Sequence, residues 1–282
     1  MTRRLTDDQK VDRELSQEVL AHYAEGLEAG RLLSNTGKLE FARTKELISR
    51  FLPPAPASVI DVGGGAGAYS LWLAGQGYEV HLVDPVPLHI EQAIAASARQ
   101  PESPIADCVL GDARELTIPD ESADAVLLLG PLYHLTDPAD RLAALAEAKR
   151  VLRPNGLLFA SCISRFASAL DGLREGLLTD PEFVAIVKQD LVDGQHRNPN
   201  NHPGYFTTAF FHHPDELASE VRTAGFVLEG IFAVEGPAWL IQNLNEQWQD
   251  SVKRDRLLDA IRWLESEPSL LGASAHVIVV AK

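Results

Sequence analysis

Residues 59–67 read VIDVGGGAG, an apolar run with one aspartate that ends in a cluster of glycines. A strand that ends in glycines lets the backbone approach a ligand closely and adopt positive φ. The helix that follows then directs its first N–H groups at that ligand. Gly63, Gly65 and Ala68 also fit the GxGxxA pattern of nucleotide-binding loops. The stretch therefore predicts a strand, a tight turn and a helix that bind a nucleotide, without showing which one.

The chain after this loop alternates between strand and helix patterns. Apolar stretches that predict strands lie at residues 58–62, 79–83, 107–110, 125–129, 157–162, 226–234 and 275–280. Helical patterns separate most of them, at residues 68–75, 88–99, 139–152, 214–224, 238–249 and 252–266. Strands that alternate with helices form a parallel sheet with helices on both faces. We therefore predict an α/β fold built on a doubly wound sheet.

Two segments stand outside this alternation. Residues 1–52 precede the first strand and carry two helical patterns, at about 11–28 and 39–51. Residues 164–212 follow the fifth strand and combine two short helical patterns with a polar stretch. Long insertions in compact domains are usually lids or binding elements. The predicted organisation has three parts. Residues 1–52 form a helical cover, residues 53–163 and 213–282 form the core, and residues 164–212 form a lid that contacts substrate.

The composition limits the classes of partner. The formal net charge is −15, while the 45% of hydrophobic and 23% of charged residues are ordinary for a globular protein. Nucleic acids and anionic membranes require basic surfaces, and a field of this sign repels both. We therefore expect neither nucleic acid nor membrane as a partner, and a homodimer stays open.

The cysteines and the apolar runs indicate the cellular compartment of the protein. Cys108 and Cys162 each stand in an apolar run, which predicts small buried residues. No Cys/His spacing of a metal site occurs, so we expect no metal. The first ten residues are polar, and no apolar run approaches the ~20 residues of a membrane span. The sequence predicts a cytoplasmic protein.

Two acids at strand ends and one turn narrow the choice of nucleotide. Asp84 ends the second predicted strand, where a carboxylate can accept both hydroxyls of a ribose. Dehydrogenases share that feature. Gly111 and Asp112 end the third strand, and an acid there can accept from an adenine amino group. Residues 153–158, RPNGLL, form a turn that leads into the fifth strand.

Taken together, the glycine loop, the two acids and this turn resemble the class I S-adenosylmethionine-dependent methyltransferases of bacterial small-molecule type. The resemblance is close over residues 57–163 and looser over the last two strands. It implies a seven-stranded, mostly parallel sheet whose last strand is antiparallel, and it implies S-adenosylmethionine as cofactor with S-adenosylhomocysteine as product. In such enzymes the glycine loop holds the methionine part, the acid matching Asp84 holds the ribose, and the acid matching Asp112 holds the adenine end.

The expected cofactor residues follow from this resemblance. Asp61 lies inside an apolar strand and needs a partner, so it either orders the glycine loop or meets the cofactor ammonium group. The full expected set is Asp61, Gly63, Gly64, Gly65, Gly67, Asp84, Pro85, Gly111, Asp112, Ala113, Leu129 and Gly130.

The end of the fourth strand indicates the kind of acceptor, because ligands lie at the carboxyl ends of parallel strands. Residues 130–135 read GPLYHL. Enzymes that methylate amino groups of adenine or glutamine carry Asn or Asp at the first of these positions, and Gly130 has no side chain to replace it. The large cover suits a small acceptor enclosed in a mostly apolar pocket. We expect a small-molecule acceptor, methylated at oxygen, nitrogen or carbon.

Methyl transfer is an in-line displacement, so alignment of the acceptor is the main requirement. A general base is needed only if the acceptor atom still holds its proton. The candidate bases are His134, His212 and His213, although each also has a structural interpretation as a packing residue or as a residue that leads into a helix. Candidate pocket residues are Tyr23, Tyr133, Arg165, Tyr205 and Trp239, with Arg31, Arg43 and Glu235 as further possibilities.

Rival interpretations remain at this stage. A non-catalytic S-adenosylmethionine-binding protein would share the cofactor residues and lack an acceptor cavity. A nicotinamide-dependent oxidoreductase would be favoured by a Tyr-x-x-x-Lys pair, but Asp137 stands four residues after Tyr133. A protein methyltransferase would need an open groove, which the predicted lid opposes.

Overall fold

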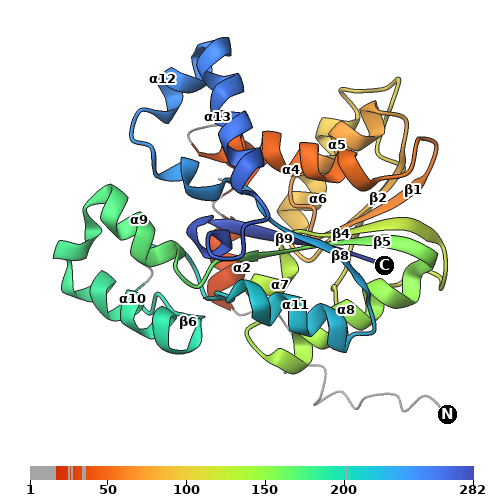
Figure 1. The fold of residues 1–282 in the computed structure, drawn as a ribbon. Coiled ribbons are helices and arrows are strands. Elements are labelled where there is room, and N and C mark those ends of the chain that lie inside the picture. Colours follow the sequence, from red (N-terminus) through yellow and green to blue (C-terminus); the bar gives the residue numbers. More distant parts are fainter. Residues whose placement is uncertain (1–16, 25, 27, 34–35, 201, 203) are drawn as a thin grey trace.

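The centre of the computed structural model, which describes residues 17–24, 26, 28–33, 36–200, 202 and 204–282, is a seven-stranded sheet (Figure 1). Its strands lie in the order β3 (Asp107–Leu110), β2 (Glu79–Asp84), β1 (Ser58–Val62), β4 (Ala123–Leu128), β5 (Leu152–Ile163), β9 (His276–Ala281) and β8 (Leu228–Ala233). The pairs from β3 to β5 are parallel, and β9 runs antiparallel to both of its neighbours. The predicted fold class, including the antiparallel last strand, is confirmed.

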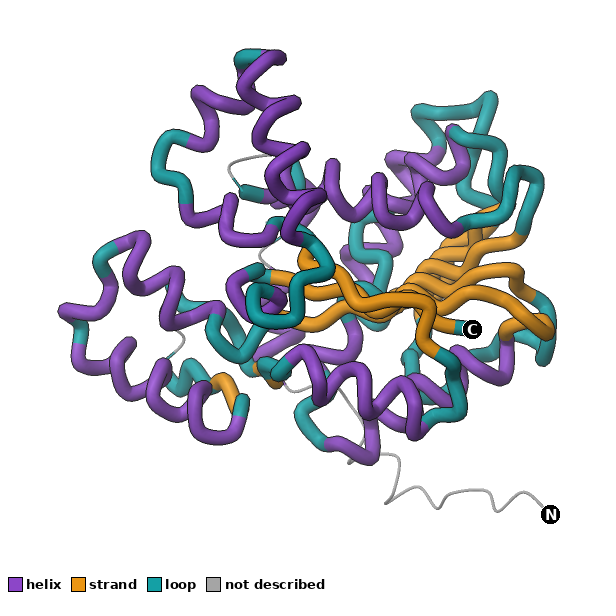
Figure 2. Tube along the Cα trace, in the orientation of Figure 1, coloured by secondary structure: helices purple, strands orange, loops and turns teal. Residues whose placement is uncertain are grey.

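Helices cover both faces of this sheet (Figure 2). One face carries α4 (Gly37–Phe51), α5 (Ala68–Gly75) and α6 (Pro87–Ser97), and the other carries α8 (Pro138–Val151) and α11 (Pro214–Thr223). The central strands are apolar on both sides because each face packs against helices. Val59 and Leu127 point to one face, while Ile60 and Leu128 point to the other. Among the helices that the structure describes, none combines the length and the apolar character needed to cross a membrane.

Most predicted elements lie within a few residues of the expected bounds, and the exceptions are short or irregular. The first predicted helix begins outside the described residues, and its described part is α2 (Gln17–Ala24), followed by the single turn α3 (Glu28–Arg31). The helix expected at 238–249 is a 3₁₀ turn, η2 (Gly236–Leu240), and then α12 (Leu244–Gln249). The turn α7 (Pro131–His134) and the ribbon β6 (Gln195–His196) with β7 (Ala209–Phe210) were not predicted, since two to four residues show no periodicity.

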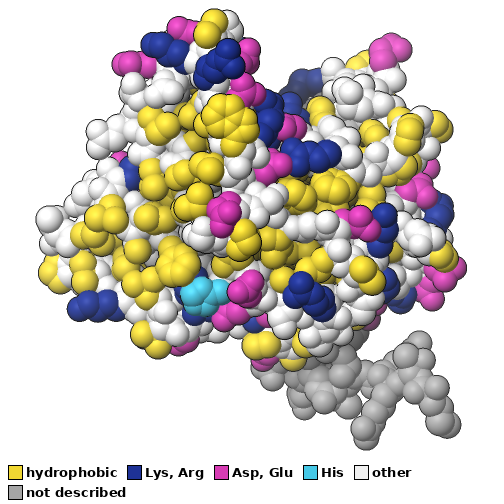
Figure 3. Space-filling view, viewed as in Figure 1, with side chains coloured by type: hydrophobic (Ala, Val, Ile, Leu, Met, Phe, Trp, Pro, Cys, Tyr) yellow, Lys and Arg dark blue, Asp and Glu magenta, His cyan; other side chains and the backbone are white. Residues whose placement is uncertain are grey.

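The insertion after β5 forms a helical lobe at the left of Figure 1. It consists of α9 (Ala167–Glu175), η1 (Leu177–Thr179) and α10 (Pro181–Asp193). Phe183, Ile186, Val187 and Tyr205 give it a small core of its own. Figure 3 shows hydrophobic side chains on the surface of this lobe, and its exposed ones include Leu173, Leu191 and Val192.

A buried arginine ties helix α4 to the C-terminal part of the chain. Arg43 is fully buried, and its Nε donates to the carbonyl oxygen of Val234 at 3.2 Å. Its two terminal nitrogens pair with Glu46, at 2.7 Å, and with Glu265, just after α13 (Ser251–Leu264). A buried charge is tolerated only when it is paired and hydrogen-bonded in this way. The pocket role considered for Arg43 is therefore corrected to a structural one.

Replacing this arginine tests the clamp. We expect Arg43→Met to lower the free energy of unfolding by about 3 kcal/mol, because the carbonyl of Val234 loses its donor and two carboxylates lose a buried partner. Urea denaturation measures the change. Arg256→Gln is the control, since among the described residues that exposed side chain pairs with Asp259 alone, and its loss should change stability by less than about 1 kcal/mol. Equal effects of the two substitutions would contradict the clamp.

Candidate active site

A cavity of about 520 Å³ runs along the carboxyl edge of the sheet. Its walls come from the loops after β1, β2, β3 and β4, from β5 and β9, and from helices α2, α4, α5, α6 and α7. The strand order changes direction between β1 and β4, which is where open α/β sheets bind ligands. The volume is typical of a small-molecule site.

The glycine loop forms the floor of this cavity, and its close contacts leave no room for side chains at two of its positions. Gly63 has φ +71°, and a Cβ there would lie 2.7 Å from Pro131. A Cβ on Gly64 would lie 2.8 Å from the carboxylate of Asp61. Gly67 adopts φ +87° at the start of α5 and does not line the cavity. The other predicted cofactor residues all line it.

Two carboxylates flank the loop. Asp61 is buried and accepts from Ser70 Oγ at 2.6 Å, and burial raises the pKa of its carboxyl group to about 6. Asp84 accepts from the backbone of Gly65 at 2.8 Å and of Val86 at 2.9 Å, and from His89 Nδ1 at 3.0 Å. A carboxylate offers about four acceptor positions, so Asp84 has about one left for a ligand.

The third predicted acid is held by an arginine. Arg114 donates to both carboxylate oxygens of Asp112, from Nε at 2.9 Å and from a terminal nitrogen at 2.6 Å. Its other terminal nitrogen binds Asp140 at 2.8 Å. Asp112 lines the cavity together with Gly111 and Ala113, and Arg114 fixes the orientation of its carboxylate.

Helices α2 and α7 supply a wall of aromatic and imidazole rings. The hydroxyl of Tyr23 lies 2.7 Å from His134 Nε2, and Tyr133 lines the cavity beside them. Burial lowers the pKa of His134 to about 4, so the ring is neutral at pH 7. His134 Nδ1, His89 Nε2 and Gln92 Oε1 are buried in this lining without a hydrogen-bond partner among the described residues. Such atoms fit a cavity that holds a polar ligand.

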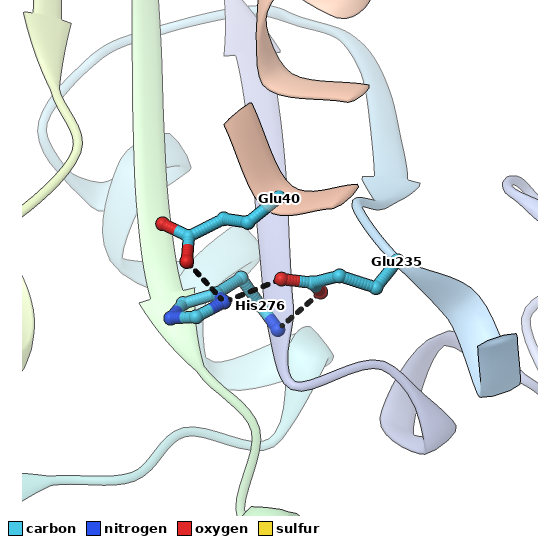
Figure 4. Close-up of side chains that lie close together, drawn as sticks. All are labelled: Glu40, Glu235 and His276. Atoms are coloured by element: carbon cyan, nitrogen blue, oxygen red, sulfur yellow. Dashed lines mark hydrogen bonds and ion pairs between the residues drawn. The ribbon is translucent and has the colours of Figure 1, made fainter. Parts of the chain in front are cut away.

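A cluster of charged side chains lines the far end, where β5 and β9 meet α4. Arg31 binds both oxygens of Glu40, at 2.5 and 3.0 Å. His276 Nδ1 lies 2.7 Å from Glu235 and 3.9 Å from Glu40 (Figure 4). Burial disfavours the charged ring, but the two carboxylates outweigh it and raise the pKa of His276 to about 9. Although burial opposes its charge, Arg31 and His276 hold the pKa of Glu40 below its usual value.

Sequence reasoning named Arg31 and Glu235 as further possibilities but missed Glu40, Ser161 and His276, which all belong to this end. The available signal was a histidine at the start of the otherwise apolar strand HVIVVA. Glu40, Glu235 and His276 could offer three ligand atoms within 4.8 Å of one another. Their ion pairs with each other and with Arg31 already satisfy these atoms, so the cluster does not favour a metal centre.

Two of the three histidines predicted as bases lie outside the cavity lining. His212 is fully buried, and its Nε2 lies 3.3 Å from Glu220. His213 stands at the start of α11, where its backbone N–H donates to Glu216 at 2.8 Å. Neither residue lines the cavity, and His134 is the predicted base that does.

The predicted pocket residues of the insertion and of η2 do not line the cavity. Arg165 donates to the carbonyl of Phe211 at 2.7 Å, Tyr205 donates to Asp180 at 2.6 Å, and Trp239 Nε1 donates to the carbonyl of Ala273 at 2.8 Å. These bonds hold their side chains in other packing layers. No described residue between 164 and 212 lines the cavity, although Phe206 packs behind His134. In this structure the insertion packs behind the wall of α2 and α7 through Phe206, and the lid expected at residues 164–212 stays a prediction.

Comparisons with known proteins agree with this geometry. A protein-family model described as a methyltransferase domain matches residues 60–160. An uncharacterised methyltransferase of Mycobacterium tuberculosis is 38% identical over 40% of this chain and 42% of that protein, so the chain spans less than half of this relative. A ubiquinone biosynthesis O-methyltransferase of Xanthomonas axonopodis is 30% identical over 69% of this chain and 72% of that protein. A solved S-adenosylmethionine-dependent methyltransferase structure from Methanosarcina mazei has a TM-score of 0.57 at 21% identity, covering 83% of this chain and 95% of that one.

The fold and the cavity define a doubly wound α/β protein with a small-molecule site at the carboxyl edge of its sheet. With these relatives, the assignment becomes specific. The chain belongs to the class I S-adenosylmethionine-dependent methyltransferases, and S-adenosylmethionine is the cofactor that this family uses.

The charged cluster predicts a pH dependence of stability. The pKa of His276 rises from 6.5 to about 9 on folding, so its protonated form stabilises the native state fully below pH 6.5. This contribution is lost as the pH rises through 9. The groups that face the ring are Glu40, Glu235 and Arg31.

We expect the stability advantage of the native protein over His276→Gln to shrink by on the order of 2 kcal/mol between pH 6 and pH 9.5. Urea denaturation of both proteins at the two pH values measures it. His81→Gln, on the exposed side of β2, controls for the loss of a histidine. A difference that stays constant with pH would show that the ring is not held as a cation.

Proposed function

We propose that the chain transfers a methyl group from S-adenosylmethionine to a small-molecule acceptor enclosed in the cavity. The observation that carries this proposal is the extent of the cavity, which continues from the loops after β1, β2 and β3 to a second polar end over β5 and β9. A purely cofactor-binding protein has no need of that second end. The Xanthomonas relative, whose name refers to ubiquinone biosynthesis, supports a small acceptor.

The residues of the glycine-loop end suit the cofactor. We propose that the backbone of residues 63–65 and the carboxylate of Asp61 receive its methionine part, because a buried carboxylate with a raised pKa gains from a cationic partner. Asp84 would accept from the ribose, and Asp112 from the adenine end. Pro85, Gly111, Ala113, Leu129 and Gly130 would form the remaining contacts. When bound, S-adenosylmethionine supplies a methyl group activated by its sulfonium.

The protein itself then has to align the acceptor and exclude water. Tyr23 and His134 close the cavity from the side of α2 and α7. The ring of His134 is neutral at pH 7 because burial lowers its pKa to about 4, so it can accept a proton from an acceptor group that still carries one. Tyr23 holds His134 Nε2 at hydrogen-bond distance and sets the orientation of the ring.

Calorimetric titration with S-adenosylmethionine, S-adenosylhomocysteine and NAD tests the cofactor assignment. We expect the first two to bind and NAD not to bind. Asp84→Asn should weaken the binding of S-adenosylmethionine and of S-adenosylhomocysteine by roughly 1.5–3 kcal/mol each, because hydrogen bonds to a charged group are lost. Asp107→Asn, at the exposed start of β3, is the matched control. Binding of NAD alone, or unchanged affinity in Asp84→Asn, would contradict the assignment.

Turnover tests the role of His134. With an acceptor found by screening phenols, carboxylates and amines for S-adenosylhomocysteine release, we expect His134→Gln to lower kcat about 100-fold, at the lower end of general-base effects. Because the pKa of His134 is about 4, its contribution should be constant from pH 6 to 8 and fall only below pH 5. His81→Gln should keep the native rate. If His134→Gln keeps the native kcat, His134 is a packing residue. If no acceptor causes release of S-adenosylhomocysteine, a non-catalytic binding protein is favoured.

A further inference from the structure

We propose that His276 is the residue that recognises the methyl acceptor, and that the acceptor carries an anionic oxygen, as in a carboxylate, phenolate or enolate, which binds to the Nε2–H of His276. This inference rests on the proposed methyl transfer and adds the chemical class of the substrate. It does not require that the recognised oxygen is the atom that is methylated.

The position of His276 separates it from the nucleoside end of the cavity. His276 opens β9, and β9 is four strand positions away from β2, whose last residue is Asp84. At about 4.8 Å for each strand, this places the two residues ~19 Å apart along the sheet edge. Ser161 of β5 and Ile278 of β9 line the cavity beside His276. The room at this end is therefore available to a second molecule.

The ring of His276 is held in one orientation by a buried acid. Glu235 Oε1 lies 2.7 Å from Nδ1, and Glu235 Oε2 accepts from the backbone N–H of His276 at 3.0 Å. Ser274 Oγ donates to the same Oε2 at 2.8 Å, and Glu235 is 2% exposed. Because a carboxylate only accepts, Nδ1 carries the proton of this bond. Figure 4 shows that the second ring nitrogen lies on the side of the ring opposite Glu235.

This second nitrogen is available to a ligand. No described residue forms a hydrogen bond with Nε2, while the side chain lines the cavity and is 20% exposed. The nearby carboxylates of Glu235 and Glu40 favour the doubly protonated ring, in which Nε2 also carries a proton. Nε2 therefore presents a charge-assisted donor to the cavity, and such donors bind anionic oxygens most strongly.

The other charges at this end do not cancel that preference. Glu40 would repel an anion, but Arg31 pairs with both of its oxygens. Ser161 offers a neutral hydroxyl group. An ammonium group placed against His276 would face a cation directly, so the site also discriminates against amines. The net charge of −15 gives the rest of the surface little affinity for anions, which confines the effect to this cavity.

Three small aromatic probes of similar size test the recognition. Protein saturated with S-adenosylhomocysteine is titrated with benzoate, benzamide and benzylammonium, and binding is followed by calorimetry and by the NMR signal of the His276 ring. We expect benzoate to bind about tenfold more tightly than benzamide, the gain from one charge-assisted hydrogen bond, and benzylammonium to bind most weakly. In His276→Gln the affinity for benzoate should fall to that for benzamide, whereas His81→Gln should keep the native preference for benzoate.

A second pair of ligands shows whether His276 serves the cofactor instead. S-adenosylhomocysteine carries the amino-acid part that 5′-methylthioadenosine lacks. We expect His276→Gln to leave the affinity for both unchanged. A loss of affinity for S-adenosylhomocysteine alone would assign His276 to the cofactor carboxylate and overturn the proposal, as would equal binding of benzoate and benzamide to the native protein or a His276 signal that benzoate does not move. Failure of S-adenosylhomocysteine to bind native protein would instead refute the proposed function itself.

Glu235 is a positioning residue in this scheme and gives an independent check. Glu235→Gln keeps a side chain of the same size and removes the charge behind the ring. We expect the pKa of His276, followed by NMR, to fall from about 9 toward its usual value, and the preference for benzoate over benzamide to fall with it at pH 7.5. A lowered pKa with an unchanged preference would contradict the role of the charged ring.

Discussion

The close approach of the β1 loop to its neighbours is the constraint on which the rest of the site depends. Side chains at Gly63 and Gly64 would collide with Pro131 and with Asp61, so the loop can pass between α7 and the end of β1 only as bare backbone. The N–H of Gly65 then reaches the carboxylate of Asp84 at 2.8 Å. Three strand ends are locked to one another by these contacts, and the cavity floor is fixed before any ligand binds. Preorganisation of this kind reduces the ordering cost of binding.

The cavity lining after β1, β2 and β3 could be predicted from the sequence because its information is local. A loop, an acid at the end of the next strand and an acid at the end of the third follow one another within about fifty residues, and the parallel topology brings them to one edge. The charged end could not be predicted in the same way. It joins Arg31 and Glu40 from the N-terminal helices to His276 of β9 and to Glu235, which follows β8. They become neighbours because β9 lies between β5 and β8, and the spacing of these residues in the sequence does not predict that contact.

The histidines show why residue type alone misleads. His212 follows β7 and His276 opens β9, and both pair with a glutamate. His212 is enclosed between Glu220 and the guanidinium of Arg141, and burial lowers its pKa. His276 faces two carboxylates and a cavity, and its pKa is raised. The difference lies in the charges that surround each ring. Sequence patterns fix the alternation of faces but not the charges that a distant helix brings to them.

Helix α4 connects the stability of the fold to the chemistry of the site. Arg43 anchors the helix through Glu265 and the carbonyl of Val234, next to Glu235 in the chain. One turn earlier, Glu40 of the same helix faces the cavity and lies 3.9 Å from His276. Residues three apart on a helix share a side, so the anchored arginine also fixes the position of the glutamate. A helix that shifted by even one ångström would change the distance from Glu40 to His276, and with it the charge state of the ring that faces the acceptor. The buried clamp and the charged end of the cavity therefore act as one unit, since the same helix carries both.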